Sequence, residues 1–375
     1  MARFTVGPLA NFGYTQNVIN FFEITEGELV VANASLIRVD YGDGEIENYG
    51  GTFGFAGSLA GEPTSGTLRS FSSSFNGVTA YSITGFAVDA PTFVNAVNTP
   101  SRSDDFAILA DALSGNDVFL GGTVGDELIG YAGNDNIQGR GGNDILDGDA
   151  GNDRLFGGAG NDIGMGDEGN DRFSGSLGND QFYGGSGVDI GIGGDGNDRM
   201  YGGDDNDRLF GGDGNDTGEG GNGNDILRGE GNRDRLFGGE GIDRLFGGDD
   251  VDVLRGDGGN DLYFGGLGGD RLLGGAGSDR FYFNSVEESQ AGSRDIITSF
   301  ESGTDLIFLR GMDADETVAG NQTFSFIGAE RFSGEAGELR VQGAIVQGDV
   351  DGDRRADFLL TVRGDAPDEA SDFIL

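Results

Sequence analysis

Through the middle of the chain, apolar residues recur about once in every nine positions and do not form the runs or alternations of ordinary helices and strands. Most of them follow an Asp by two positions, as at Leu128, Ile137, Leu146, Leu155, Phe173, Phe182, Met200, Leu209, Leu227, Leu236, Leu245, Leu254 and Leu272. One apolar side chain in nine residues cannot cover a helix face or an ordinary strand. It can fill a solenoid, in which each short strand contributes one inward side chain and equivalent positions stack from turn to turn. The pattern therefore predicts an all-β solenoid.

The polar positions keep the same period, because an Asp occupies every ninth position from Asp117 to Asp279. The candidate metal ligands among them are Asp126, Asp135, Asp144, Asp153, Asp162, Asp171, Asp180, Asp189, Asp198, Asp207, Asp216, Asp225, Asp234, Asp243, Asp252, Asp261, Asp270 and Asp279. A Gly stands five positions before each of these, and the complete phrase Gly-Gly-x-Gly-x-Asp begins at Gly157, Gly184, Gly193, Gly211, Gly220, Gly238, Gly265 and Gly274. Glycine suits turns at a fixed pitch, because positive φ and close backbone approach cost it little.

The stacked Asp residues indicate bound cations. Like charges at the strand spacing of about 4.8 Å repel one another unless a cation lies between them. Calcium takes six to eight oxygen ligands, and Gly-rich turns present backbone carbonyls beside each carboxylate, so we include the glycines above in the ligand set. If two nonapeptides complete one turn, Asp residues eighteen apart face each other across a site. The sequence therefore predicts multiple Ca²⁺ ions.

Residues 115–282 resemble the RTX family, whose calcium-binding nonapeptide is Gly-Gly-x-Gly-x-Asp-x-U-x, where U is apolar. The resemblance implies a parallel β-roll with calcium in its turns. One departure is that the apolar position is Gly at Gly164, Gly191 and Gly218, twenty-seven residues apart. Aromatic residues share that spacing at Phe156, Tyr183, Phe210, Phe237 and Phe264. Duplication of a three-repeat unit explains the twenty-seven-residue spacing. Two alternatives remain open: a solenoid turn with three sides, and a stripe of aromatic residues that binds a ligand.

Residues 283–375 lose the period and predict a separate β-rich cap and secretion domain. Residues 294–300, 337–340, 348–353 and 356–358 resemble the C-terminal domain of serralysin-type secreted proteases. Within it, the alternating carboxylates that would wrap one hard cation are Asp349, Asp351, Asp353 and Asp357, and the alternative is a polar turn. The resemblance implies that the final residues, 372–375, are an uncleaved signal for type I secretion. The alternative is an ordinary frayed terminus.

Residues 1–100 predict a β-rich module of unknown function, joined to the repeats by a linker over 101–114. Strands are expected over 36–41 and 45–49 around an Asp-Gly turn, and over 71–75 and 78–86 around Asn76-Gly77. A short helix is expected to begin at Pro91. The module resembles N-terminal β domains that precede RTX repeats in bacterial exported proteins, a likeness that assigns no activity.

Composition narrows the chemistry. The chain has no His, Cys or Lys, which excludes a Ser-His-Asp triad, a thiol nucleophile, a Schiff base and the His-Glu-x-x-His zinc helix of a metalloprotease. The formal charge is 23 − 65 = −42, which disfavours nucleic acid and anionic membranes as partners and favours cations. No apolar run approaches the roughly 18 residues of a membrane span, and the N-terminus lacks a signal-peptide core.

We therefore expect a calcium-folded, non-enzymatic bacterial protein that is secreted to the extracellular space through the type I apparatus. Its expected role is a structural or self-assembling component of the cell surface or extracellular matrix, with no nucleic-acid partner and no membrane insertion. One alternative is an adhesin or glycan-binding protein that uses residues 1–100. Another is an enzyme with carboxylate-only chemistry. Its candidate residues, which also suit solvated strand edges, are Glu23, Glu26, Glu28, Asp40, Asp43, Glu45 and Glu47.

Overall fold

The computed structural model describes residues 45–49, 52–56, 70–75, 78–84, 115–123, 125–365, 367 and 369–375. The chain divides into two compact units, residues 1–174 and 175–375. Within the described residues all regular elements are β-strands, apart from two single-turn 3-10 helices, which confirms the all-β class. The helix expected at Pro91, the strand expected over 36–41 and the carboxylates Glu23 to Asp43 lie outside the described residues.

The first unit begins with two hairpins. Strands β1 (Glu45–Tyr49) and β2 (Thr52–Ala56) pair antiparallel, so the strand expected over 45–49 is present and its described partner follows it in the chain. Strands β3 (Ser70–Phe75) and β4 (Val78–Thr84) confirm the hairpin expected around Asn76-Gly77. Strand β4 then pairs antiparallel with β5, the first strand of the repeats, and so covers its free edge.

The repeats of the first unit form two parallel sheets. The first contains β5 (Val118–Leu120), β7 (Asn136–Gly141), β9 (Arg154–Ala159) and β11 (Arg172–Leu177), whose last residues pass into the second unit. The second contains β6 (Glu127–Ile129), β8 (Ile145–Asp147) and β10 (Ile163–Glu168).

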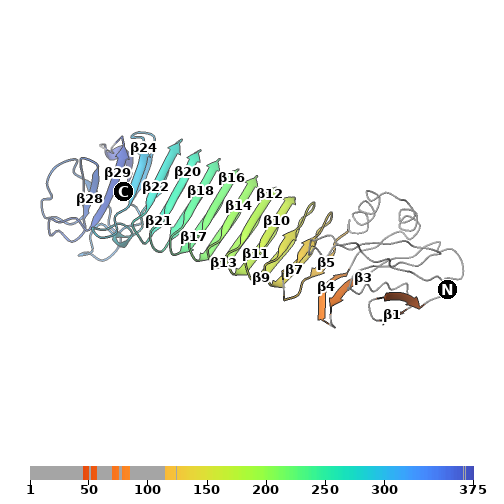
Figure 1. The fold of residues 1–375 in the computed structure, drawn as a ribbon. Helices are drawn as coiled ribbons and strands as arrows, with labels where there is room; N and C mark the ends of the chain where they lie inside the picture. The colour runs from red at the N-terminus through yellow and green to blue at the C-terminus, as the bar shows by residue number, and fades with distance from the viewer. Residues whose placement is uncertain are drawn as a thin grey trace. The chain divides into compact units, whose positions relative to one another are not determined.

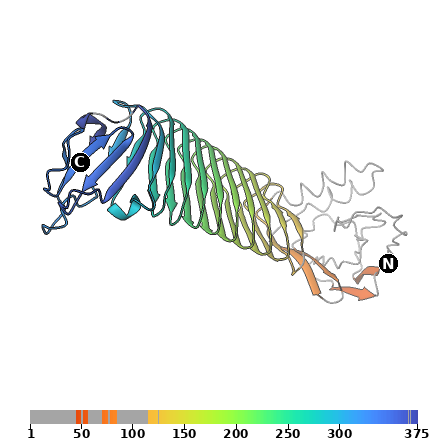
Figure 2. The same ribbon diagram turned by 60° about the vertical axis from the view of Figure 1, so that its left-hand side comes forward.

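The second unit continues with two parallel sheets, whose strands lie side by side in Figures 1 and 2. The even-numbered sheet contains β12 (Gln181–Ser186), β14 (Arg199–Asp204), β16 (Thr217–Asn222), β18 (Arg235–Glu240), β20 (Val253–Gly258) and β22 (Arg271–Ala276). The odd-numbered sheet contains β13 (Ile190–Asp195), β15 (Arg208–Asp213), β17 (Ile226–Gly231), β19 (Arg244–Gly248), β21 (Leu262–Gly266) and β23 (Arg280–Tyr282).

Paired strands are eighteen residues apart, as in Gln181 opposite Arg199 and Arg208 opposite Ile226. Two nonapeptides therefore complete one turn, and the three-sided alternative is wrong. The aromatic residues at twenty-seven-residue spacing do not stack as one ladder, because within the second unit Tyr183 and Phe237 lie in the even-numbered sheet whereas Phe210 and Phe264 lie in the odd-numbered sheet.

The core consists of the single inward residue of each repeat, and these residues are almost completely buried. The glycines that interrupt this row face bulky neighbours. A Cβ at Gly164 would lie 2.3 Å from the ring of Phe173, and a Cβ at Gly191 would lie 2.7 Å from the ring of Phe182. Glycine and phenylalanine thus compensate in volume across the narrow interior, as close packing requires.

Both stacks continue beyond residue 282. Strand β24 (Ile296–Phe300) pairs with β22, and β25 (Leu306–Phe308) pairs with β23, both in parallel. The even-numbered sheet is then extended by β29 (Phe358–Gly364), β28 (Ile345–Asp349), β27 (Glu338–Gln342) and β26 (Ser325–Phe326). The odd-numbered sheet ends with β30 (Phe373–Ile374) on β25. The 3-10 helices are η1 (Val286–Glu288) and η2 (Ala370–Asp372).

Candidate metal centres

Each Asp of the nonapeptide immediately precedes a strand, so these carboxylates line the turns of the solenoid. All of them from Asp117 to Asp279 are at most 6% exposed. One oxygen, Oδ1, accepts a hydrogen bond from the backbone N–H of the Asp eighteen residues earlier, at 2.6 to 2.9 Å, as in Asp207 N–H to Asp225 Oδ1. We call this series the Asp ladder. It joins each turn to the next.

The second carboxylate oxygen is buried, and in most of the ladder no group of the described residues contacts it by a hydrogen bond. This holds for Oδ2 of Asp135, Asp144, Asp153, Asp198, Asp207, Asp216, Asp225, Asp234, Asp243, Asp252, Asp261, Asp270 and Asp279. A buried acceptor without a donor costs roughly 1 to 3 kcal/mol, and more when it is charged. A row of such atoms therefore requires a partner that is not part of the polypeptide.

The glycine five positions before each ladder Asp lets the carboxylate and the next turn pack directly against its backbone. A Cβ at Gly202 would lie 2.3 Å from Asp207 Oδ2 and 2.6 Å from the carbonyl oxygen of Gly220 in the next turn. At Gly247 the same point lies 2.4 Å from both Asp252 Oδ2 and the Gly265 carbonyl oxygen. A carboxylate and a carbonyl oxygen thus converge beside a glycine at which any side chain would collide with both. Both are hard oxygen donors of the kind that Ca²⁺ takes, so the donor type fits Ca²⁺.

All eight glycines predicted as carbonyl ligands occupy this position. A Cβ on any of them would lie 2.1 to 2.7 Å from Oδ2 of the Asp five residues later; they are Gly157, Gly184, Gly193, Gly211, Gly220, Gly238, Gly265 and Gly274. The glycine two positions before the Asp meets a different neighbour. At Gly214, where φ is +148°, a Cβ would lie 1.6 Å from the carbonyl oxygen of Gly196. Successive turns therefore stack too closely for side chains at either position.

The Asp ladder is electrostatically unfavourable without a cation. Burial raises the pKa of Asp225 to about 6, of Asp243 to about 7 and of Asp252 to about 8. The hydrogen bond from the backbone opposes the rise in each case, and neighbouring ladder carboxylates add to it for Asp243 and Asp252. A bound divalent cation would reverse this effect, because it stabilises the charged form.

Two residues outside the nine-residue period extend the ladder. Asp295 Oδ1 accepts from the N–H of Asp270 at 2.8 Å, and Asp305 Oδ1 accepts from the N–H of Asp279 at 2.9 Å. Asp295 is fully buried, and burial raises its pKa to about 9. The nine-residue period did not predict either residue, because they lie twenty-five and twenty-six residues from their partners. The sequence feature that could have identified them is local: like the other ladder residues, each is an Asp directly before a strand, and that strand begins with two apolar residues.

A second ladder, of Asn residues one position before the Asp, was also missed. Asn134 Oδ1 accepts from the N–H of Asn152 at 2.8 Å, and Asn197 Oδ1 accepts from the N–H of Asn215 at 2.9 Å. These bonds run opposite to those of the Asp ladder, from the later turn to the earlier one. The Asn side chains are exposed, so we infer that they connect successive turns and do not bind an ion. The recurring Asn-Asp pair is the sequence feature that could have predicted this ladder.

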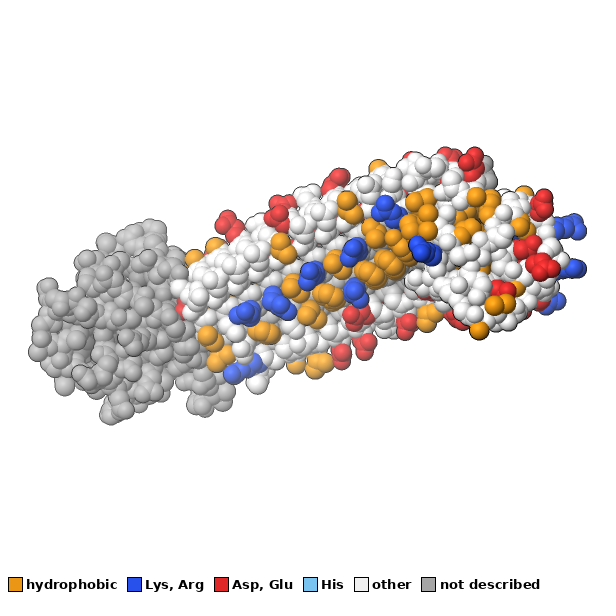
Figure 3. Space-filling model, turned by 180° about the vertical axis from the view of Figure 1, so that it is seen from behind, with side chains coloured by type: hydrophobic (Ala, Val, Ile, Leu, Met, Phe, Trp, Pro, Cys, Tyr) orange, Lys and Arg blue, Asp and Glu red, His pale blue; other side chains and the backbone are white. Residues whose placement is uncertain are grey.

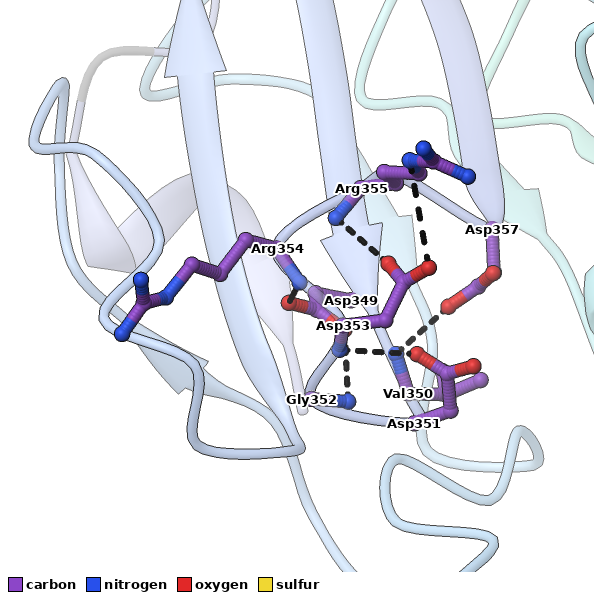
Figure 4. A network of polar contacts seen from close by, with 8 residues as sticks. All are labelled: Asp349, Val350, Asp351, Gly352, Asp353, Arg354, Arg355 and Asp357. Atoms are coloured by element: carbon purple, nitrogen blue, oxygen red, sulfur yellow. Dashed lines mark hydrogen bonds and ion pairs between the residues drawn. The ribbon is translucent and has the colours of Figure 1, made fainter.

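The C-terminal carboxylates lie together in one loop, shown in Figure 4. One carboxylate oxygen from each of Asp349, Asp351 and Asp353 lies within 4.8 Å of the others, and Asp357 is not in this group. Asp349 is buried, and its two oxygens accept from the N–H groups of Gly352 at 2.7 Å and Arg354 at 2.9 Å.

The remaining carboxylates of this loop also accept from nearby backbone. Asp351 accepts from the N–H of Asp353 at 2.9 Å, and Asp353 accepts from that of Arg355 at 2.7 Å. Asp357 Oδ2 accepts from the N–H of Val350 at 2.9 Å, and burial raises its pKa. The loop is thus organised by its own backbone donors.

Residues 120–285 match the family model described as the RTX calcium-binding nonapeptide repeat (4 copies). The matched stretches are 120–155, 129–164, 156–191, 165–199, 192–227, 228–263 and 255–285. The chain therefore carries RTX repeats that form a β-solenoid and bind Ca²⁺ as structural ions rather than as a cofactor. The match does not extend to the region in which we noted a likeness to serralysin-type proteases. No curated protein matches the chain.

Proposed function

We propose that this protein is a calcium-folded structural component of the bacterial cell surface or extracellular matrix, exported by type I secretion. The observation that carries the proposal is the row of buried Asp Oδ2 atoms without hydrogen-bond partners among the described residues, several of them close to carbonyl oxygens of the next turn. RTX repeat proteins are typically secreted, and within the described residues no helix is long and apolar enough to cross a bilayer. We assign the chain no catalytic activity.

Calcium would act as the folding switch. The Asp ladder accumulates buried negative charge, so the repeats should stay unfolded where free calcium is low, as inside the cell. Ions that bind the folded state alone add RT ln(1 + [Ca²⁺]/Kd) per site, roughly 1.4 kcal/mol at ten times Kd. Several sites then add several times this amount to a stability that is usually about 5 to 15 kcal/mol. Folding would therefore follow export.

The C-terminal segment is proposed as the secretion signal, by its resemblance to that of serralysin-type proteins. In the folded structure Phe373 and Ile374 form β30 on the edge of β25, and Leu309 N–H donates to the Ile374 carbonyl at 2.9 Å. The side chain of Asp372 is buried and accepts from the N–H of Gly303 at 2.9 Å. A transporter would therefore read this segment before the chain folds.

The test is far-UV circular dichroism of the full chain in chelator, titrated with Ca²⁺ and, separately, with Mg²⁺. We expect β signal and compaction to appear with Ca²⁺ and not with Mg²⁺, because Mg²⁺ demands a tighter octahedral site and gives up its water reluctantly. Full β signal in chelator, unchanged by Ca²⁺, would contradict the proposal. Export is tested separately by expressing the chain with and without residues 372–375 in cells that have a type I apparatus.

A further inference from the structure

The outward side of the odd-numbered sheet in the second unit carries two rows of side chains, one and three positions after each ladder Asp. The first row is Ile190, Arg208, Ile226, Arg244, Leu262, Arg280 and Leu306. The second row is Ile192, Phe210, Arg228, Phe246, Phe264, Tyr282 and Phe308. We call these two rows the arginine–aromatic face.

The aromatic rings of this face stack on one another along the row. Ring centroids lie 4.6 Å apart for Phe246 and Phe264, 4.6 Å for Phe264 and Tyr282, and 4.4 Å for Tyr282 and Phe308. The guanidinium carbon of Arg228 lies 4.5 Å from the centroid of Phe246. Since the ring faces cover each other, the row presents ring edges to solvent, and ring edges carry partial positive charge. The face therefore suits an anionic partner and not a flat ring that stacks.

The charge of the face is opposite to that of the chain. Neither row contains an Asp or Glu, although the whole chain has a formal charge of −42. Arg208, Arg228 and Arg244 are exposed, and none of the Arg residues of the face forms an ion pair among the described residues. Figure 3 shows an apolar stripe with arginines along it, while the acidic side chains lie toward the borders. The arginines therefore remain available for carboxylates from outside.

The ends of the odd-numbered strands and the turns that follow them provide such carboxylates. The exposed acids there are Asp195, Asp213 and Glu230, within the last two residues of β13, β15 and β17, and Asp249 and Asp250, directly after β19. Exposed apolar residues lie along the same edge: Val251, 42% exposed, follows Asp250, and Leu267, 48% exposed, follows β21 in the next turn of the solenoid. We call this row the acidic turn edge. It has an acid in each of four consecutive turns, about 4.8 Å apart, and three consecutive turns of the arginine–aromatic face carry one Arg each, namely Arg208, Arg228 and Arg244.

We propose that the arginine–aromatic face of one copy of this chain binds the acidic turn edge of a second copy. The proposal rests on the structural role above and names its contact surface. Two copies of one solenoid have the same pitch, so charges of opposite sign can meet turn after turn, which complementary interfaces require. Packing two arginine–aromatic faces together would bury arginines without anions, which is costly. The contact joins different surfaces, so it can propagate into filaments or layers.

The experiment is sedimentation velocity on the calcium-loaded full chain at low and high salt. The face variant is Arg208→Glu with Arg244→Glu. The matched control is Arg199→Glu with Arg235→Glu, which makes the same charge change on the outward side of the even-numbered sheet. We expect the wild type and the control to assemble with rising concentration at low salt, and the face variant to associate at least tenfold more weakly. Calcium-dependent circular dichroism verifies that each variant folds.

A charge-swap mixture makes the test specific to the two surfaces. Asp213→Arg with Asp249→Arg reverses the acidic turn edge, and this variant should not assemble alone. Mixed with the face variant, it should restore association, because each variant supplies the surface that the other needs. A wild type that folds with Ca²⁺ yet stays monomeric overturns the contact and leaves the calcium switch intact. Equal losses in the face variant and the control, or no rescue on mixing, also overturn it.

Discussion

The Asp ladder and the loop around Asp349 are both rich in carboxylates, yet they satisfy them in different ways. In the ladder, Oδ1 accepts a hydrogen bond from a backbone N–H of the preceding turn, whereas in most repeats Oδ2 is buried and has no hydrogen-bond partner among the described residues. In the loop, both oxygens of Asp349 accept from backbone N–H groups, and Asp351 and Asp353 are exposed. The loop can therefore keep its shape without an ion, whereas the ladder cannot do so cheaply.

Acidic spacing alone does not identify a cation-dependent fold. An exposed carboxylate is solvated, so its local attraction for a cation contributes little to folding. A buried carboxylate with one orphan oxygen makes the folded state depend on what neutralises it. We therefore place the calcium switch in the ladder and expect the loop to contribute little to it. The predictions that follow challenge this distinction, beginning with the largest effect.

The first prediction concerns the glycine that packs against a ladder carboxylate. Gly202→Ala would place a methyl group 2.3 Å from Asp207 Oδ2 and 2.6 Å from the Gly220 carbonyl oxygen. We expect a loss of roughly 2 to 3 kcal/mol in the free energy of unfolding in calcium, typical of overpacking a rigid interior. The measurement is urea unfolding at saturating Ca²⁺, followed by circular dichroism.

The matched control is Gly231→Ala in the same part of the solenoid. Its nearest neighbour, Asp213 Oδ1, would lie 3.8 Å from the new methyl group, so we expect a change within about 0.5 kcal/mol. Similar stabilities for the two variants would show that the glycine position beside Asp207 is not closely packed, and that the ladder does not depend on a glycine there.

The second prediction separates charge from hydrogen bonding in the ladder. Asp225→Asn retains an oxygen that can accept the N–H of Asp207, at present 2.7 Å away, and removes the negative charge. We expect the calcium concentration at the midpoint of folding to rise several-fold, because a neutral amide is a weaker Ca²⁺ ligand than a carboxylate. Asp213→Asn, which removes an exposed acid from a nearby turn, should leave the midpoint almost unchanged. Equal shifts would mean that net charge governs folding, not ladder ligation.

Repetition decided how much of this could be predicted from sequence. The inward Leu209 and Leu227 and the buried Asp225 follow from a period that gives each residue the same environment in turn after turn. The period left two or three repeats per turn open, and the pairing of strands eighteen residues apart shows that there are two. The hairpin at Asn76-Gly77 was predictable for a different reason, since that dipeptide specifies a tight turn on its own.

The remaining features depend on contacts that no period encodes. Asp295 joins the ladder across an irregular connection, so only the fold reveals that it lies in register with Asp270. The loop around Asp349 has the spacing of a cation site, but the backbone donors that occupy its carboxylates come from a local conformation that spacing does not specify. The arginine–aromatic face was not predicted from the sequence for a similar reason. Its rings come into register at eighteen residues, whereas the conspicuous sequence spacing was twenty-seven.

The third prediction uses pH to distinguish stabilisation of the ladder by protonation from stabilisation by a bound cation. The pKa values of Asp225, Asp243 and Asp252 are raised by burial to about 6, 7 and 8, well above that of an unfolded Asp. A raised pKa means that protonation stabilises the folded state, and that this stability is lost as pH rises through the folded-state values. In chelator, lowering the pH from about 8 to about 5 should therefore increase ordered β structure.

Calorimetry in buffers of different ionisation enthalpy provides the second measurement for this prediction. Near pH 5, where protonation orders the calcium-free chain, calcium binding should release protons, because the ladder carboxylates must be deprotonated to coordinate the ion. The release should fall towards zero by about pH 8, where the calcium-free chain is unfolded and its Asp side chains, with an ordinary pKa of about 3.9, are already ionised. Calcium binding without proton release at pH 5, together with no acid-induced ordering in chelator, would show that the raised pKa values do not govern folding of the ladder.

The smallest expected effect is in the loop around Asp349. Asp351→Asn with Asp353→Asn removes two exposed charges, and both new amides can still accept the N–H groups of Asp353 and Arg355. We expect the free energy of unfolding to change by no more than about 0.5 kcal/mol, as for most surface substitutions. The calcium concentration at the midpoint of folding should stay almost unchanged. A shift as large as that of Asp225→Asn would instead show that the loop binds calcium as part of the folding reaction. Exposed carboxylates with backbone donors of their own would then have to be counted among the structural sites, together with the buried ladder.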